Sequence, residues 1–448
     1  MPHRGQALII GGGLAGCEAA WQLLCRGCRV TLWEMKPERY SPAHSSPDLA
    51  ELVCSNSLRS GDPASAAGLL KEEMRRLGSL FMAAADQTSL PAGKSLAVDR
   101  ERFSAYIQER LLAWGERFQL VRQELTELPT ATPAIVATGP LTSDALAAAI
   151  QRLTGRECLY FYDAIAPIVT ADSVDPNRSF WASRYDPSSA ENAGDYLNCP
   201  LDEETYRAFR EEILTADKFP LRSFENPRYF EGCLPVEILA QRGSRTLLFG
   251  PMKPVGLTDP RTGRQPWAVV QLRRENASGT LLNMVGFQTK LTRPEQERIF
   301  RMIPGLVQAE FARYGSIHRN TFLRSPGLIN DRLQLISHPH LFFAGQLTGV
   351  EGYMESAAMG LYAGISLGRM LTGGELSPPP DMTALGSLIR HITTAGKNDF
   401  QPMNINHGLL RPLSLRIKKR ERGREYARRS LADLSAWMTA QGIEVLPD

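Results

Sequence analysis

The stretch from residue 8 to residue 34 constrains the fold more than any other part of the sequence. An apolar run is followed by glycines at Gly11, Gly13 and Gly16, then by a helical pattern and a second apolar run that ends at Glu34. This order of strand, GxGxxG turn, helix, strand and acid is typical of a βαβ unit that binds a dinucleotide. It predicts an α/β fold of the Rossmann type; the alternative is a purely structural glycine turn.

Each residue type in this turn meets a different physical demand. Gly11 allows the tight turn, Gly13 lets a pyrophosphate approach the backbone, and Gly16 lets the helix pack closely on the strand. The free N–H groups at the helix N-terminus favour the phosphates, and the Glu34 carboxylate accepts ribose hydroxyls. The cofactor-binding residues predicted here are Gly11, Gly12, Gly13, Leu14, Ala15, Gly16 and Glu34.

A second glycine-rich segment predicts that the cofactor is a flavin, FAD. An apolar run from 338 to 343 ends in Ala344-Gly345, and a helix of small residues is expected over 356–371. The N-terminus of that helix would face the pyrimidine edge of an isoalloxazine ring. An expected strand over 134–137 also runs into Thr138-Gly139, where glycine tolerates a flat cofactor close to the backbone. The further predicted binding residues are Thr138, Gly139, Gly345, Gln346 and Gly349.

Length and composition limit the class of protein. At 448 residues the chain is long enough for two or three structural units. The net charge of +3 does not by itself imply nucleic acid. Seven cysteines at irregular positions predict free thiols in a reducing compartment, and none is grouped with further metal ligands, so no metal site is expected. The lack of a signal peptide or membrane-spanning run predicts a cytoplasmic protein.

The remaining pattern predicts an interrupted cofactor domain. We expect a first part of the FAD-binding domain over 1–184, an α+β insertion that carries substrate specificity over 185–322, and a second part with a basic tail over 323–448. The expected helices cover 64–77, 100–114, 143–153 and 203–214, and Asp99 is a credible N-cap of the second. The expected strands cover 118–121, 134–137, 160–169, 247–249 and 280–287.

Two cysteines and a basic tract stand out within these units. Cys54 lies in a Ser-Asn-Ser loop of the kind that binds ligands at the ends of parallel strands, although a buried inert thiol is the alternative. Cys233 lies between a glycine and a leucine-proline pair, and the nearby carboxylates would raise its pKa, so any activation must come from elsewhere. The arginines and lysines between 411 and 429 predict either a solvated helix face or a phosphate-binding surface.

Taken together, these motifs resemble the bacterial folate- and FAD-dependent tRNA (uracil-5-)-methyltransferases, the TrmFO family, which is related to GidA. The resemblance extends over essentially the whole chain. It rests on the segments 11–20, 51–57, 162–167, 231–235 and 345–353. The last four are far more specific than a GxGxxG turn alone.

The resemblance implies a reaction and its participants. Cys233 is then the thiolate that adds to uracil C6 and makes C5 nucleophilic, and Cys54 is the second active-site thiol. 5,10-Methylenetetrahydrofolate supplies the carbon, reduced flavin carries it, and NADH or NADPH supplies electrons. Glu351 and Tyr353 would line the folate and uracil pocket, and Lys419 would bind RNA phosphate or the folate tail. The implied partner is tRNA, with a T-loop uridine flipped into the site.

Three alternative functions are distinguishable from this one. A ribosomal RNA uridine is a possible target of the same chemistry, because the target depends on surface shape. An FAD oxidoreductase acting on a small molecule would lack RNA affinity and would ignore methylenetetrahydrofolate. A non-catalytic flavin-bearing RNA-binding module would keep its function when Cys233 is replaced by alanine.

Overall fold

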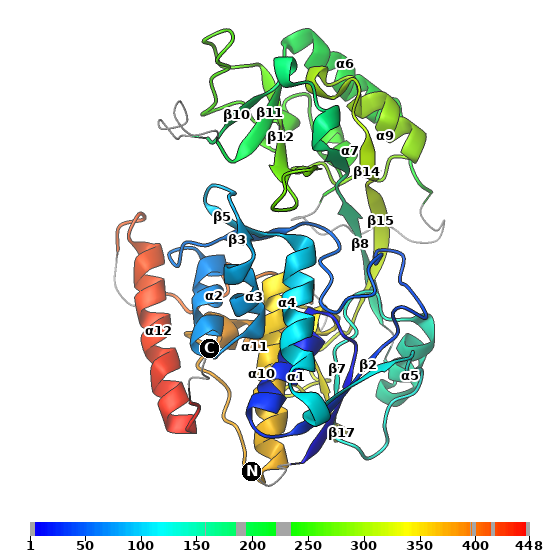
Figure 1. The fold of residues 1–448 in the computed structure, drawn as a ribbon. Helices are drawn as coiled ribbons and strands as arrows, with labels where there is room; N and C mark the ends of the chain where they lie inside the picture. The colour runs from blue at the N-terminus through cyan, green and yellow to red at the C-terminus, as the bar shows by residue number, and fades with distance from the viewer. Residues whose placement is uncertain are drawn as a thin grey trace.

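A six-stranded sheet forms the centre of the larger part of the molecule in the computed structural model (Figure 1). The structure describes residues 5–156, 158–184, 194–220, 234–394, 396, 400–413 and 417–444. In spatial order the sheet contains β16 (Gln334–Leu335), β17 (His338–Phe343), β7 (Ala134–Val136), β1 (Gln6–Ile10), β2 (Arg29–Glu34) and β6 (Phe118–Arg122). All neighbours pair in parallel except β16 and β17. This is the predicted Rossmann-type α/β arrangement.

Two helices from opposite ends of the chain lie against each other beside this sheet. They are α1 (Leu14–Cys25) and α10 (Tyr353–Leu371). A Cβ atom added at Gly360 would lie 2.1 Å from the carbonyl oxygen of Ala15, and one at Gly364 would lie 2.8 Å from that of Ala19. The two backbones are therefore in direct contact, and this contact brings the two glycine-rich segments together.

The structure confirms the predicted helix cap at Asp99 and adds one at Ser143. Asp99 accepts a hydrogen bond from the Arg102 backbone nitrogen at 3.1 Å, and Ser143 accepts one from Leu146 at 3.3 Å. These caps satisfy backbone donors that a helix leaves free at its first turn. Between α1 and the second sheet, the chain of the larger part also forms the helices α2 (Ala66–Arg76), α3 (Leu80–Gln87), α4 (Arg100–Leu112) and α5 (Asp144–Thr154).

A second six-stranded sheet forms the smaller part of the molecule and has its own apolar core. Its order is β10 (Phe180–Ala182), β11 (Tyr196–Leu201), β12 (Ala268–Arg274), β13 (Leu281–Met284), β9 (Ile168–Thr170) and β14 (Phe311–Arg313), and all its pairs are antiparallel. Its helices are α6 (Glu203–Thr215), α7 (Val236–Gln241), α8 (Thr246–Phe249) and α9 (Arg293–Phe300). β9 and β10 precede residue 185, so this sheet begins earlier in the chain than the expected insertion.

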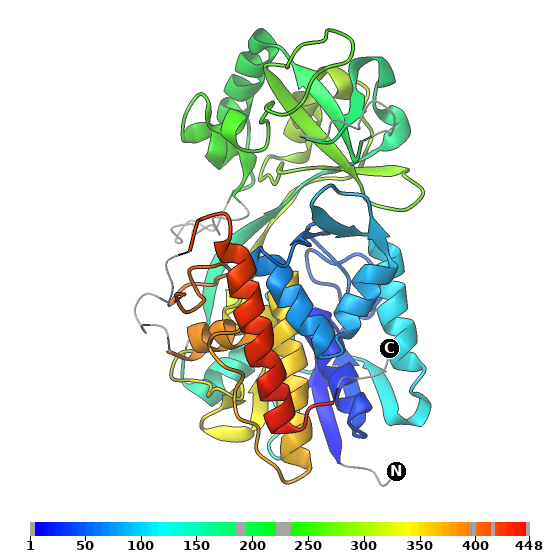
Figure 2. The same cartoon turned by 90° about the vertical axis from the view of Figure 1, so that its left-hand side faces the viewer.

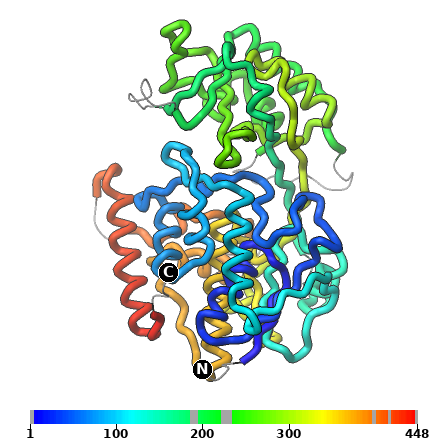
Figure 3. The backbone as a smooth tube through the Cα atoms, in the orientation of Figure 1, coloured from blue at the N-terminus to red at the C-terminus, as the bar shows by residue number. Residues whose placement is uncertain are grey.

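The described chain passes between the two parts along a two-stranded ladder (Figure 3). β8 (Leu159–Ile165) leads out of the larger part and β15 (Ser316–Phe322) leads back, paired antiparallel from Leu159 with Phe322 to Ile165 with Ser316. A small sheet of β3 (Ser57–Ser60), β5 (Ser95–Val98) and β4 (Ser89–Leu90) lies on the side of the larger part that faces the second sheet (Figure 1).

The expected strand at 247–249 was wrong, because these residues form helix α8. Leu247 and Leu248 are buried, whereas the Phe249 side chain is 78% exposed. Three apolar residues are too few to distinguish the period of a strand from that of a helix, so packing against the second sheet decided their conformation.

The C-terminal segment returns to the larger part. α11 (Ala384–Thr394) and α12 (Arg422–Gln441) both pack on α2, and Figure 2 shows α12 along the outside of this layer. Buried Glu73 joins all three helices: it accepts bonds from the backbone nitrogens of Ala384 and Leu385 at 2.8 Å each, and one from the Ser430 hydroxyl. Among the described residues, no helix is both long and apolar enough to cross a bilayer.

The contact between α1 and α10 yields a stability prediction. Gly360→Ala places a methyl group 2.1 Å from the Ala15 carbonyl oxygen, so it should push the helices apart and lower the free energy of unfolding by about 3 kcal/mol. Gly368→Ala is the matched control, because its Cβ would meet no backbone: the nearest atoms are the flexible Arg26 side chain at 3.2 Å and the Leu23 side chain at 3.7 Å, an ordinary contact. Chemical unfolding of both variants tests this, and equal stabilities would contradict it.

Candidate functional site

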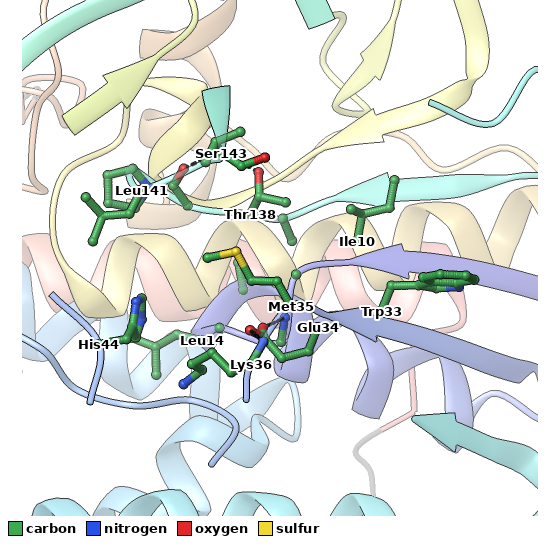
Figure 4. A pocket seen from close by; sticks show the side chains of 18 of the residues that line it. Ile10, Leu14, Trp33, Glu34, Met35, Lys36, His44, Thr138, Leu141 and Ser143 are labelled. Carbon is green, nitrogen blue, oxygen red and sulfur yellow. Dashed lines mark hydrogen bonds between the residues drawn. The ribbon is translucent and has the colours of Figure 1, made fainter. Parts of the chain in front are cut away.

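A cavity opens at the carboxyl ends of β1, β2, β6 and β7, where loops from all four strands converge (Figure 4). Parallel α/β sheets bind ligands at this edge. Figure 4 shows Thr138, Leu141 and Ser143 on one side and Glu34 with Lys36 on the other. The predicted residues that line it are Gly11, Gly12, Gly13, Leu14, Ala15, Glu34, Thr138, Gly139, Gln346 and Tyr353.

The glycines of the first turn differ in what surrounds them. Gly11 has a φ of +102°, and an added Cβ would lie 2.7 Å from the Ala137 carbonyl oxygen. A Cβ at Gly16 would lie 1.9 Å from the Gly11 carbonyl oxygen, whereas one at Gly13 would meet no atom within 4 Å. Gly13 is also the N-cap of α1 and provides no side-chain cap. The helix N-terminus therefore faces open space that suits an anionic group.

The Glu34 carboxylate is fixed at the rim of this turn. One oxygen accepts a bond from the Gly12 backbone nitrogen at 2.7 Å, and the other accepts one from the Lys36 backbone nitrogen at 2.9 Å. Each oxygen keeps a further lone pair. The buried carboxylate is thus held in one orientation beside the cavity, where it can accept hydroxyl groups.

The loop after β7 forms the facing wall. The Thr138 and Thr142 hydroxyl oxygens are 2.6 Å apart, and Thr142 donates to the Gly139 carbonyl oxygen at 2.8 Å. Gly139 has a φ of +67°, a conformation that favours glycine. These bonds fold the loop back toward α5 and leave the backbone of 138–139 against the cavity.

Sequence reasoning missed several residues of the cavity. Lys36 donates to the Asp48 carbonyl oxygen at 2.7 Å and to Glu51 at 3.1 Å, while His44 lies 2.6 Å from the Ser41 hydroxyl. Burial, and then the Lys36 charge, lowers the pKa of His44. The segment 123–125 also lines the cavity because it directly follows β6. The strand-end rule identifies 123–125 after β6 and Lys36 after β2 from sequence, but it gives no signal for His44 and Glu51, which lie further along the loop.

The two glycines of the second glycine-rich segment, Gly345 and Gly349, pack against neighbouring side chains and do not line the cavity. Their φ values are +77° and +88°, and added Cβ atoms would lie 2.9 Å from Ala15 and 2.3 Å from Phe400. Gln346 does line it, and donates to Glu351 at 2.6 Å. The segment thus fixes the start of α10 against the first turn.

Glu351 is a buried carboxyl in an acidic neighbourhood. Burial, and then repulsion from Asp163, raises its pKa to about 8, so it is protonated at neutral pH. Its Oε2 atom has no hydrogen-bond partner among the described residues. A neutral carboxyl with a free O–H group is a hydrogen-bond donor to a ligand or water.

Tyr353 joins the cavity to the loop that contains Cys54. Its hydroxyl oxygen accepts bonds from the backbone nitrogens of Cys54 at 2.6 Å and Ser55 at 3.2 Å, and burial raises its pKa. The half-buried Cys54 sulfur lies 3.8 Å from the Ala164 carbonyl oxygen. Cys233 lies outside the described residues. Lys419 is exposed just before α12 and does not line the cavity.

Comparison with known proteins identifies relatives over nearly the whole length. The family model described as glucose inhibited division protein A matches residues 6–375. A protein named methylenetetrahydrofolate--tRNA-(uracil-5-)-methyltransferase TrmFO from Syntrophus aciditrophicus is 58% identical over 97% of this chain and 98% of its own. The protein of the same name from Geobacter sulfurreducens is 59% identical over 97% of this chain and 99% of its own.

Solved structures support the fold. Two crystal forms of Aquifex aeolicus GidA are 16% identical, with TM-scores of 0.69 and 0.71. The matches cover 98% and 99% of this chain and 74% and 76% of those chains. At this identity the likeness concerns the arrangement of the elements only.

The raised pKa of Glu351 yields a prediction about stability and pH. The folded protein keeps a proton between pH 4.5 and about 8 that the unfolded chain releases, so stability falls as pH rises through this window. Glu351→Gln removes that loss. Its thermal midpoint should match the wild type at about pH 5 and exceed it at about pH 9. Exposed Glu116→Gln is the control; equal pH slopes for all three proteins would contradict the prediction.

Proposed function

We propose that this chain, which belongs to the glucose-inhibited division protein A family and, within it, to the TrmFO proteins, forms 5-methyluridine in the T-loop of tRNA. The proposed carbon donor is 5,10-methylenetetrahydrofolate. The observation that carries this proposal is the position of Tyr353. Its side chain lines the dinucleotide cavity, and its hydroxyl holds the backbone of Cys54. This contact supports the proposal that the cofactor and the thiol loop belong to one site.

FAD is the cofactor that we assign to the cavity. Its adenosine would lie at the first turn, with the ribose hydroxyls on Glu34 and the pyrophosphate over Gly13 and the N-terminus of α1. The fit is supported by the open space at Gly13, where any side chain would occupy the volume of a phosphate. When bound and reduced by NADH or NADPH, the flavin supplies the carrier of the one-carbon unit and its electrons.

The two cysteines would divide the chemistry on the pyrimidine. A Cys233 thiolate forms a bond to uracil C6, which leaves C5 nucleophilic enough to attack the one-carbon unit. Loss of the C5 proton and release of the carbon from its carrier would leave an exocyclic methylene at C5. Two electrons supplied by the reduced flavin would convert this methylene to a methyl group, and expulsion of the Cys233 thiolate would then restore the pyrimidine ring. Cys54 serves as the second thiol, which assists transfer or proton movement. Glu351, neutral at pH 7, is suited to donate a hydrogen bond to a ring of folate or uracil.

The RNA partner would be bound in part by the positive charge just before α12 and in its first turn. Lys418, Lys419 and Arg424 are exposed and have no ion-pair partner within the part of the chain that the structure describes. Such charges bind phosphates in a salt-dependent way. The target uridine must leave its stack to reach the thiols, as in other enzymes that act on a base. A ribosomal RNA uridine is the second candidate target, and an assay on both kinds of RNA distinguishes the two.

Substitutions at two glycines of the first turn test a role in folding separately from a role in cofactor binding. Gly16→Ala places its methyl group 1.9 Å from the Gly11 carbonyl oxygen, so it should destabilise the protein even without cofactor. Gly13→Ala meets no atom within 4 Å and should fold normally, yet bind FAD at least about tenfold more weakly. Thermal unfolding of the apoproteins and fluorescence titration with FAD measure the two effects. Unchanged FAD affinity in Gly13→Ala would argue against a pyrophosphate at this turn.

The proposed reaction is tested by incubating the protein with methylenetetrahydrofolate, NADH and unmodified tRNA or rRNA transcripts. We expect 5-methyluridine in the tRNA; product in rRNA alone would move the target, and no product in either would refute the activity. A 5-fluorouridine RNA should form a covalent adduct that Cys233→Ala abolishes and Cys54→Ala retains. Half-buried Cys25 at the end of α1 provides a control substitution, Cys25→Ala, that should keep both product and adduct.

A further inference from the structure

The loop over residues 52–57, here called the thiol loop, is held by elements far apart in the chain. Tyr353 of α10 binds its backbone at Cys54 and Ser55. Arg100 of α4 donates to the Leu52 carbonyl oxygen. A third contact comes from Arg273 of β12, which belongs to the second sheet.

Arg273 reaches two side chains that directly follow Cys54. Its Nε donates to the Asn56 Oδ1 atom at 2.9 Å, and its Nη2 donates to the Ser55 hydroxyl oxygen at 2.9 Å. Because the guanidinium group is planar and both bonds come from one rigid fork, they fix two neighbouring residues of the loop together.

The burial of Arg273 is costly and calls for an explanation. The side chain is only 4% exposed, and its acceptors in the loop are neutral oxygens rather than carboxylates. Burial lowers its pKa overall, although nearby Glu275 and Tyr196 favour its charged form. A buried charge with such partners is weak evidence for stability, because an apolar residue of similar size is often as stable there. The two bonds to the loop, in contrast, fix the positions of Ser55 and Asn56.

Asn56 completes the connection between the loop and the second sheet. Its side chain is fully buried, and its amide donates to the carbonyl oxygens of Val98 at 3.0 Å and Arg274 at 2.9 Å. The amide nitrogen is therefore engaged by both the small sheet and β12, and the Oδ1 atom is engaged by Arg273 of β12. β12 thus contacts both polar atoms of this loop side chain.

The turn between β12 and β13 also contacts the start of α4. Glu275 binds the Arg100 Nε atom at 2.9 Å, and the Ala277 backbone nitrogen donates to Asp99 at 2.8 Å. Arg100 in turn holds the thiol loop at Leu52. The second sheet thus reaches the loop both directly and through α4.

We propose that Arg273 is a positioning residue for Cys54, through which the docked second sheet sets the orientation of a thiol that belongs to the first domain. The proposal rests on the proposed function in placing Cys54 in the active site. It adds that the thiol is oriented only when the two parts of the molecule are docked, so the part expected to carry substrate specificity also completes the site.

The first test measures the thiol itself and needs neither RNA nor folate. On the full-length, flavin-loaded protein, the rate of Cys54 alkylation by iodoacetamide is followed by mass spectrometry of the Cys54 peptide. Arg273→Ala should free the half-buried thiol and raise this rate about fivefold or more, and Arg273→Lys should restore part of the protection. Arg274→Ala is the matched control, because that side chain stacks on Trp181 at 4.3 Å and its carbonyl remains. Equal rates in all four proteins would overturn the proposal.

The second test separates positioning from general destabilisation. Arg273→Ala should lower kcat for methylation about tenfold while KM for tRNA changes less than about twofold. Ser55→Ala removes the loop side of the same contact, so the Ser55→Ala/Arg273→Ala double variant should lose less activity than the product of the two single effects predicts. Fully multiplicative effects on kcat and alkylation would refute the pairing. If neither the wild type nor any variant methylates RNA but alkylation responds as expected, the proposed function fails and the positioning role stands.

Discussion

The backbone contact between α1 and α10 is the interaction on which the rest of the structure depends. Gly360 and Gly364 leave no room for side chains between these helices, so the carbonyl groups of Ala15 and Ala19 lie directly against α10. Helices that pack this closely have little freedom to slide, because any shift brings backbone into backbone. The chain leaves the first domain at β8 and returns at β15, and this contact guarantees that the returning segment meets the first turn in one register.

The site that results is assembled from separate parts of the chain by polar contacts. Glu34 and the glycine turn come from the first βαβ unit, Tyr353 comes from α10, and the thiol loop is held from the second sheet by Arg273. Buried polar groups contribute less to stability than an apolar core, but they accept only one geometry. The apolar contacts thus hold the two parts together as folded units, and the polar contacts decide how the reactive groups face one another.

Local sequence patterns predicted the helices, strands and turns whose conformation is set by neighbouring residues. The first βαβ unit, the cap at Asp99 and the helix after the second glycine-rich segment formed as expected, because turn geometry and capping are set by neighbouring residues. The strand expected at 247–249 became a helix, because packing against distant residues outweighed a short local signal. The second sheet also includes strands from before residue 185, because pairing with distant strands decides which strands join a sheet.

The sequence by itself determined the type of turn after the first strand and the carboxylate at the end of the second, since each depends on residue types at fixed local spacing. It also predicted two cysteine segments, of which the one at Cys233 lies outside the described residues. Only the tertiary structure decided that Tyr353 holds the backbone of Cys54, that Lys36, His44 and Glu51 line the same cavity, and that an arginine from another sheet orients the thiol loop. These contacts join residues that are tens to hundreds of positions apart. No local spacing encodes such pairs, because they exist only once distant segments of the chain have packed together.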